Sequence, residues 1–217
     1  MSEVSKAMMK RIAEERTRID AYKHSVGTEK FFNDRQYKED IEWLTLAYLA
    51  DILAATGAVH PQFAEKIQGD GQPDFQTYIQ PDIRFRRVEV TEVHRPDYRR
   101  GAVFRALAAR GTTMYPIGRP HQQPWSSFAK VLRNKIRKPY SPDSWLVIYH
   151  NMGYSDFQDG ELWHERTQST LRNWTYESDA TCDITRSQFE SIFVIDSSGT
   201  AAIRLHPHWD VVKALRE

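Results

Sequence analysis

Two carboxylates in a β-rich stretch are the residues of this sequence best suited to chemistry. Asp74 begins one predicted strand, and Glu89 lies in the middle of the next, with fourteen residues between them. Because alternate residues of a strand share a face, Val88 and Val90 are expected to point to a core, and Glu89 and Thr91 to the opposite side. If the strands pair as a hairpin, Asp74 lies beside Glu89, and two such carboxylates repel unless a proton or a cation joins them.

Carboxylate oxygens are the ligands that Mg²⁺ and Mn²⁺ prefer. Glu89 also lies in a strongly basic segment: residues 84–140 contain fourteen Arg and Lys against three Asp and Glu, a net charge of +11 in a chain of +1. Such a local excess is typical of a polyanion-binding surface. The pattern therefore predicts metal-assisted hydrolysis of phosphodiesters. The alternative is that these bases are spread over a solvated surface and pair with acids elsewhere.

The order Pro73-Asp74, fourteen residues, then Glu89-Val90-Thr91 resembles the PD-(D/E)XK motif of restriction-endonuclease-like nucleases. The resemblance covers about residues 34–150. It implies a nuclease that uses Mg²⁺ or Mn²⁺, with Asp74 and Glu89 as catalytic metal ligands, and with DNA as the favoured nucleic-acid partner and RNA as the alternative. Thr91 stands where the family has lysine. The alternatives are therefore an inactive nucleic-acid-binding or assembly protein on the same fold, or a globular protein whose basic segment contacts a protein partner.

A lysine on a later predicted helix could replace the missing one. Over residues 125–138, a helical period gathers four apolar side chains on one arc: Phe128, Val131, Leu132 and Ile136. Lys135 lies near the centre of that arc, where an ammonium group is costly unless it reaches solvent or meets an acid. We expect Lys135 to be the catalytic lysine, with Lys138 in reserve; the alternative is that Lys135 reaches solvent along the apolar face. Some branches of the resembled superfamily carry their lysine on a neighbouring helix.

Other residues are candidates for the same site. Asp82 follows a second proline but reads better as part of the turn between the two strands. The resemblance makes Glu42, on an apolar helix, a further candidate near the metal, although acids near a helix start also interact favourably with the helix dipole. Arg99 and Arg100, just beyond the second strand, and Lys138 are the expected phosphate contacts.

The elements that position these residues follow from periodicity and turn residues. Helices are expected over 3–26, 34–56, 97–110 and 125–138, and strands over 74–79, 84–93 and 145–149 and as a strand pair within 191–205; residues 58–73 are expected to be a broken connection. The predicted fold class is α/β: a restriction-endonuclease-like mixed β-sheet flanked by helices, with an N-terminal helical extension. Residues 1–33 are expected to form a helical arm that could join two copies into a homodimer. Residues 34–217 are expected to form the nuclease-like domain.

Composition excludes several other classes. With 40% hydrophobic residues the chain is not expected to be disordered, and it has neither a signal peptide pattern nor a membrane-length apolar run. The single Cys182 is compatible with a reducing cytoplasm. His206 and His208 lack a third ligand at suitable spacing, so packing is the favoured role. Aromatic residues that could stack on bases are more simply explained as core: Trp163, Trp174 and Tyr176.

Overall fold

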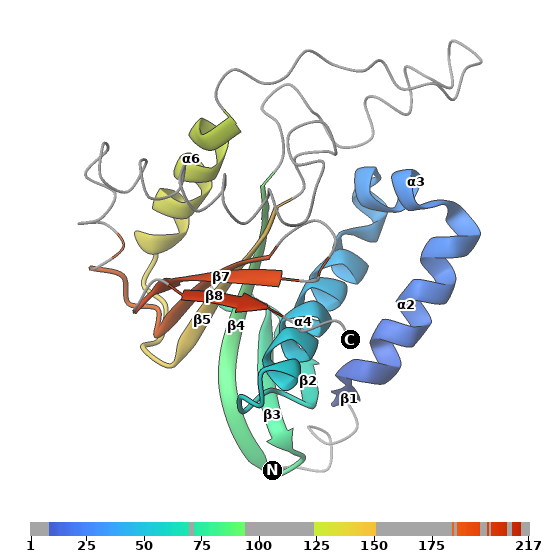
Figure 1. The fold of residues 1–217 in the computed structure, drawn as a ribbon, viewed down its shortest axis with the longest axis horizontal. Coiled ribbons are helices and arrows are strands. Elements are labelled where there is room, and N and C mark those ends of the chain that lie inside the picture. Colours follow the sequence, from blue (N-terminus) through green and yellow to red (C-terminus); the bar gives the residue numbers. More distant parts are fainter. Residues whose placement is uncertain are drawn as a thin grey trace.

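The described part of the protein is a mixed β-sheet with helices on both faces (Figure 1). The structure, a computed structural model, describes residues 9–69, 72–93, 124–150, 184, 186–195, 199, 201–207 and 210–213. In this part of the chain the strands follow one another across the sheet in chain order: β1 (Lys10–Arg11), β2 (Phe63–Lys66), β3 (Phe75–Gln80), β4 (Ile83–Val93), β5 (Ser144–His150), β6 (Ser191–Ile195), β7 (Ala201–His206) and β8 (Asp210–Lys213). The α/β class is confirmed.

The centre of the sheet is parallel and its margins are antiparallel. β4, β5 and β6 run in the same direction, and every other neighbouring pair is antiparallel. A parallel pair needs a long crossover, and α6 (Pro124–Ile136) lies in the chain between β4 and β5. The continuous apolar run of β5 fits its central place, since both of its faces are covered.

Each face of the sheet has its own hydrophobic core. On one side, α4 (Lys38–Ala55) packs with residues such as Val88, Val90 and Tyr149. On the other, α6 contributes Phe128 and Leu132, which are fully buried, to a core with alternate residues of β5 and β6. In Figure 1, α4 and α6 lie on opposite sides of the strands. Residues of β4 therefore reach either helix according to their parity.

The expected hairpin and the expected apolar helices are confirmed. β3 and β4 pair antiparallel around the turn at 81–82, with Phe75 opposite Val88. The helix expected over 34–56 is present as a short 3₁₀ turn, η1 (Arg35–Tyr37), followed by α4; Gly57, with φ +72°, comes two residues after the helix end. The β6–β7 pair is also present. None of the helices described is long and apolar enough to cross a membrane.

The N-terminal helices contribute to the hydrophobic core on the α4 side of the sheet. α2 (Ile12–Val26) is followed by α3 (Thr28–Asn33), and both lie beside α4 in Figure 1. Ile12, Ile19 and Phe31 are buried in the same core as α4. Residues 10 and 11 pair with β2 rather than continuing the helix. The division at residue 33 and the homodimer contact stay predictions.

The prediction that residues 58–73 form only a broken connection was wrong in part. Residues 63–66 form β2, which pairs antiparallel with β3, so this segment adds a strand to the sheet. β8 was not anticipated either. The expected helix over 97–110 lies outside the described residues, as do Trp163, Trp174 and Tyr176.

Gly199 provides a test of how α4 packs against the β6–β7 connection. It has φ +70°, and a Cβ atom there would overlap the ring of Tyr48 on α4. Strain and overlap together should make Gly199→Ala destabilising by about 3 kcal/mol. Gly57 has a similar φ with nothing near its missing Cβ, so Gly57→Ala should cost only about 1 kcal/mol. Urea unfolding of both variants measures the difference, and equal losses would contradict the predicted overlap.

Candidate active site

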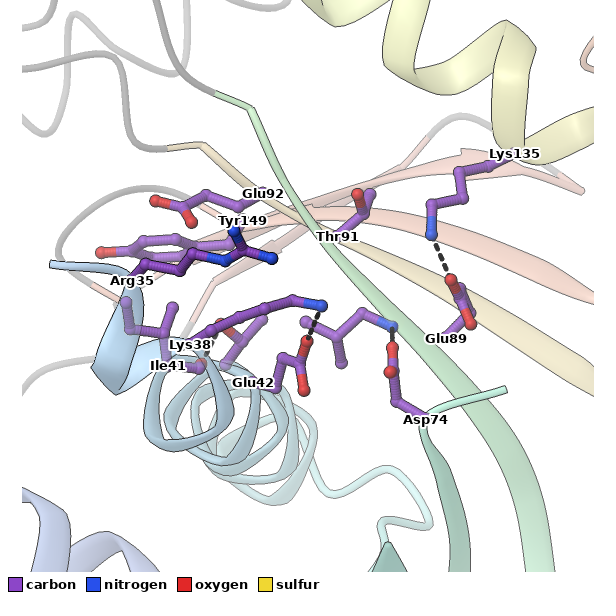
Figure 2. A pocket seen from close by; sticks show the side chains of 12 residues that line it. Arg35, Lys38, Ile41, Glu42, Asp74, Glu89, Thr91, Glu92, Lys135 and Tyr149 are labelled. Carbon is purple, nitrogen blue, oxygen red and sulfur yellow. Dashed lines mark hydrogen bonds and ion pairs between the residues drawn. The ribbon is translucent and has the colours of Figure 1, made fainter. Parts of the chain in front are cut away.

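A cavity of about 440 Å³ opens beside residues 89–92 of β4. These residues lie beyond Val88, which pairs with Phe75, the first residue of β3. It is lined by side chains from η1, α4, β4, β5 and α6 and by the residue before β3: Arg35, Lys38, Ile41, Glu42, Thr45, Asp74, Glu89, Val90, Thr91, Glu92, Lys135 and Tyr149. Figure 2 shows the carboxylates of Glu42, Asp74 and Glu89 following one another along this edge. The expected catalytic residues Asp74, Glu89 and Lys135 therefore all line one cavity.

Asp74 is held by the backbone of β4. Among the described residues, the last residue of β4 in register with β3 is Val88, opposite Phe75, so no described strand pairs with this edge beyond it. The Asp74 Oδ2 atom accepts a hydrogen bond of 2.8 Å from the Val90 N–H, in place of a ladder partner. The Asp74 carbonyl also accepts from the Ile67 N–H at 2.9 Å. The start of β3 thus fixes one carboxylate at the cavity.

Glu89 faces α6 and meets Lys135 there. In the parallel register Glu89 lies beside Leu146 of β5, which belongs to the α6-side core. Glu89 is only 5% exposed, and its Oε1 atom pairs with the Lys135 ammonium group (Figure 2). The buried Tyr140 hydroxyl lies against the same carboxylate; burial and the Glu89 charge raise the pKa of Tyr140, so it stays protonated.

The expected position of Lys135 is thus found. Phe128 and Leu132 are buried and Val131 and Ile136 pack beside them, whereas Lys130 and Arg137 are exposed on the rest of the helix. An ammonium group on this apolar face meets a buried acid instead of solvent, which is the arrangement that offsets its desolvation. Whether Lys135 takes part in catalysis stays a prediction.

A second lysine lies at the other end of the site. The Lys66 Nζ atom of β2 pairs with Glu42 Oε2 and lies 3.5 Å from Asp74 Oδ1. Glu42 is buried on α4, and its other oxygen is 3.3 Å from the ammonium group of the exposed Lys38. The Lys66 ammonium group also lies 4.5 Å from the centre of the Phe75 ring. Glu42 therefore joins the two predicted carboxylates at the same cavity.

The three carboxylates influence one another. Burial raises the pKa of the Asp74 carboxyl, and the negative charges of Glu89 and Glu42 raise it further. Lys66 and the Val90 N–H act in the opposite direction, but the pKa remains above its usual range. Negative charge is thus concentrated at a place where a cation would relieve repulsion.

The donor set suits a hard divalent cation, although no cage is preformed. Asp74, Glu89 and Glu42 supply only oxygen, the ligand type of Mg²⁺ and Mn²⁺. Across the residues that the structure describes, no three acidic, His or Cys groups are arranged closely enough to hold a metal ion. Lysine ammonium groups contact all three carboxylates instead. The residues therefore fit such an ion in kind, and binding would require the lysines to give way.

Of the other residues considered from the sequence, Thr91 lines the cavity, whereas Lys138 and Asp82 do not. Thr91 is half-buried at the cavity, in the position where the resembled motif has lysine. Lys138 is exposed beyond the end of α6, and Asp82 is exposed in the β3–β4 turn. Arg99 and Arg100 lie outside the described residues.

Sequence reasoning missed Lys66 and the basic residues Arg35 and Lys38. Lys66 was overlooked because its segment was assigned to a connection. The only signal was that residues 62–68 lie between the breakers Pro61 and Gly69, because the apolar residues Phe63, Ala64 and Ile67 do not alternate with polar ones. Arg35 and Lys38 line the cavity from η1 and the start of α4, and both are exposed.

Comparisons of the chain with models of protein families, with curated proteins and with solved structures found no match.

Proposed function

We propose that this protein is a metal-dependent nuclease of the PD-(D/E)XK type, and that it hydrolyses phosphodiester bonds of DNA. The observation that carries this proposal is the meeting of Asp74, Glu89 and Lys135, from three separate elements, at one cavity. The order of the elements around them supports it: an apolar helix, a hairpin with the two acids, a helix with the lysine, and a central parallel strand.

Asp74 and Glu89 would hold the ion, with Glu42 as a further oxygen ligand at the same cavity. When bound, Mg²⁺ or Mn²⁺ supplies a water of lowered pKa and neutralises charge that develops on the phosphate. Asp74 is oriented for this by the Val90 N–H, and Glu89 by Tyr140 and Lys135. Rigid positioning of ligands is what makes such electrostatic stabilisation effective.

Lys135 would act on the reacting groups themselves. Lys135 and Glu89 are 46 residues apart in the chain but meet at the cavity. From there the Lys135 ammonium group could donate a hydrogen bond to the attacking water or to a phosphate oxygen. In this proposal Lys135 takes over the role that Thr91 cannot fill, because a hydroxyl carries no positive charge.

The exposed bases at the cavity suit an anionic substrate. Arg35 and Lys38 flank the carboxylates on the side away from Lys135 (Figure 2). Together with Arg99, Arg100 and Lys138 they would contact phosphates, which positions the strand without reading its sequence.

The direct test is cleavage of supercoiled plasmid DNA with Mg²⁺, with Mn²⁺ and with EDTA, beside single-stranded DNA and RNA of equal length. We expect relaxed or linear DNA only with a divalent ion. Asp74→Asn, which keeps an oxygen that can accept from Val90, is the matched control for a contaminating nuclease. Salt-dependent DNA binding without cleavage would favour the inactive binding protein, and neither binding nor cleavage would contradict both.

A further inference from the structure

We propose that Lys66 is a built-in counter-ion that occupies the place of a divalent cation between Glu42 and Asp74, and that it leaves this place when the metal binds. This inference rests on the proposed function and concerns how its metal site is regulated.

The position of the Lys66 ammonium group is defined by three contacts. It pairs with Glu42 Oε2, lies 3.5 Å from Asp74 Oδ1 and lies 4.5 Å from the centre of the Phe75 ring. These are two acidic partners and one aromatic face, the surroundings that hold a cation best. No other described lysine contacts two of the three carboxylates at the cavity.

The balance of charges at the cavity explains why Lys66 would have to move when a divalent cation binds. Glu42, Asp74 and Glu89 carry three negative charges, and three ammonium groups contact them: those of Lys38, Lys66 and Lys135. A divalent cation added to a neutral set gains little attraction and meets repulsion from each ammonium group. Displacement of one lysine leaves an excess of negative charge for the incoming ion.

Lys66 is the ammonium group best placed to leave. Its side chain is 25% exposed and its four-carbon stem is flexible, so it can turn into solvent without disturbing β2. Lys135 pairs with the more deeply buried Glu89 and is 19% exposed. Lys38 is 67% exposed, and solvent already screens its charge.

The test is calorimetric titration of Mn²⁺ into the wild-type protein, Lys66→Gln and the control Lys38→Gln. Both variants remove one ammonium group from Glu42, but only the first removes the group shared with Asp74. We expect Lys66→Gln to bind Mn²⁺ about tenfold tighter or more, and Lys38→Gln to stay within about threefold of wild type.

A second variant and a second readout guard against misfolding. Lys66→Arg keeps the charge, and its guanidinium group can pair with carboxylates through two parallel hydrogen bonds, so it should bind Mn²⁺ several-fold more weakly than wild type. In thermal unfolding, Lys66→Gln should melt below wild type without metal and gain more than wild type from saturating Mn²⁺, because Asp74 then loses its contact with Lys66 and Glu42 keeps only that with the exposed Lys38.

The outcomes separate this inference from the proposed function. Wild-type binding of Mn²⁺ with equal or weaker binding by Lys66→Gln overturns the role of Lys66 and leaves the metal site intact. Absence of Mn²⁺ binding by every protein, Lys66→Gln included, overturns both. Binding by Lys66→Gln alone supports both, because the vacated site then accepts the ion.

Discussion

Lys135→Ala is expected to lower the rate of Mg²⁺-dependent DNA cleavage by about a hundredfold to a thousandfold, the effect of removing one preorganised donor from an active site. DNA affinity should change little, because Lys135 lies inside the cavity and not on the exposed basic surface. Single-turnover cleavage under saturating enzyme, together with a binding titration on the same DNA, separates the two effects.

The structural role of Lys135 has to be distinguished from a catalytic one. Glu89 is buried, so loss of its partner is expected to destabilise the protein by about 3 kcal/mol or more. Lys135→Arg keeps the charge and should retain stability, yet its guanidinium group presents donors in a different, planar geometry, so cleavage should still fall by about tenfold or more.

Lys130→Ala is the matched control, since it removes an exposed lysine from the same helix as Lys135. Its cleavage rate should stay within about threefold of wild type. Undiminished cleavage by folded Lys135→Ala would remove Lys135 from the proposed mechanism.

Asp74→Asn and Glu89→Gln are each expected to weaken Mn²⁺ binding by about a hundredfold or more, because each replaces a charged oxygen ligand by a neutral amide. Both substitutions preserve shape, and an asparagine at 74 can still accept from the Val90 N–H. Calorimetric titration measures the affinity, and thermal unfolding of the metal-free variants checks that the fold persists.

Glu92→Gln is the control for a general charge effect. Glu92 lines the same cavity but lies beside Tyr149, apart from Asp74 and Glu89 (Figure 2). Its variant should bind Mn²⁺ within about threefold of wild type. Equal losses in all three variants would show that the ion responds to overall negative charge, and full-strength binding by Glu89→Gln would exclude Glu89 as a ligand.

Local patterns were enough to predict how the two acids pair and which face of its helix carries Lys135. Asp74 and Glu89 belong to neighbouring strands, and a period of two together with the turn at 81–82 determines how these strands pair. The apolar arc of the α6 segment follows a period of 3.6, and a lysine inside such an arc has to meet an acid or reach solvent. These inferences need only the sequence within one or two elements.

Partners from distant elements could not be predicted in this way. Lys66 and Glu42 are 24 residues apart and meet because α4 crosses one face of the sheet while β2 joins the edge of β3. The opposite faces of Glu89 and Val90 are readable from alternation, but which helix covers each face depends on the parallel crossover between β4 and β5.

Local backbone geometry and side-chain alternation were therefore enough to predict the α/β class, the carboxylate hairpin and the lysine on an apolar helix face. The packing of distant segments places Lys66 between Glu42 and Asp74, and α2 in the core of α4. The physical reason is that buried charges and apolar faces choose partners by the total free energy of packing and desolvation, which no single segment contains.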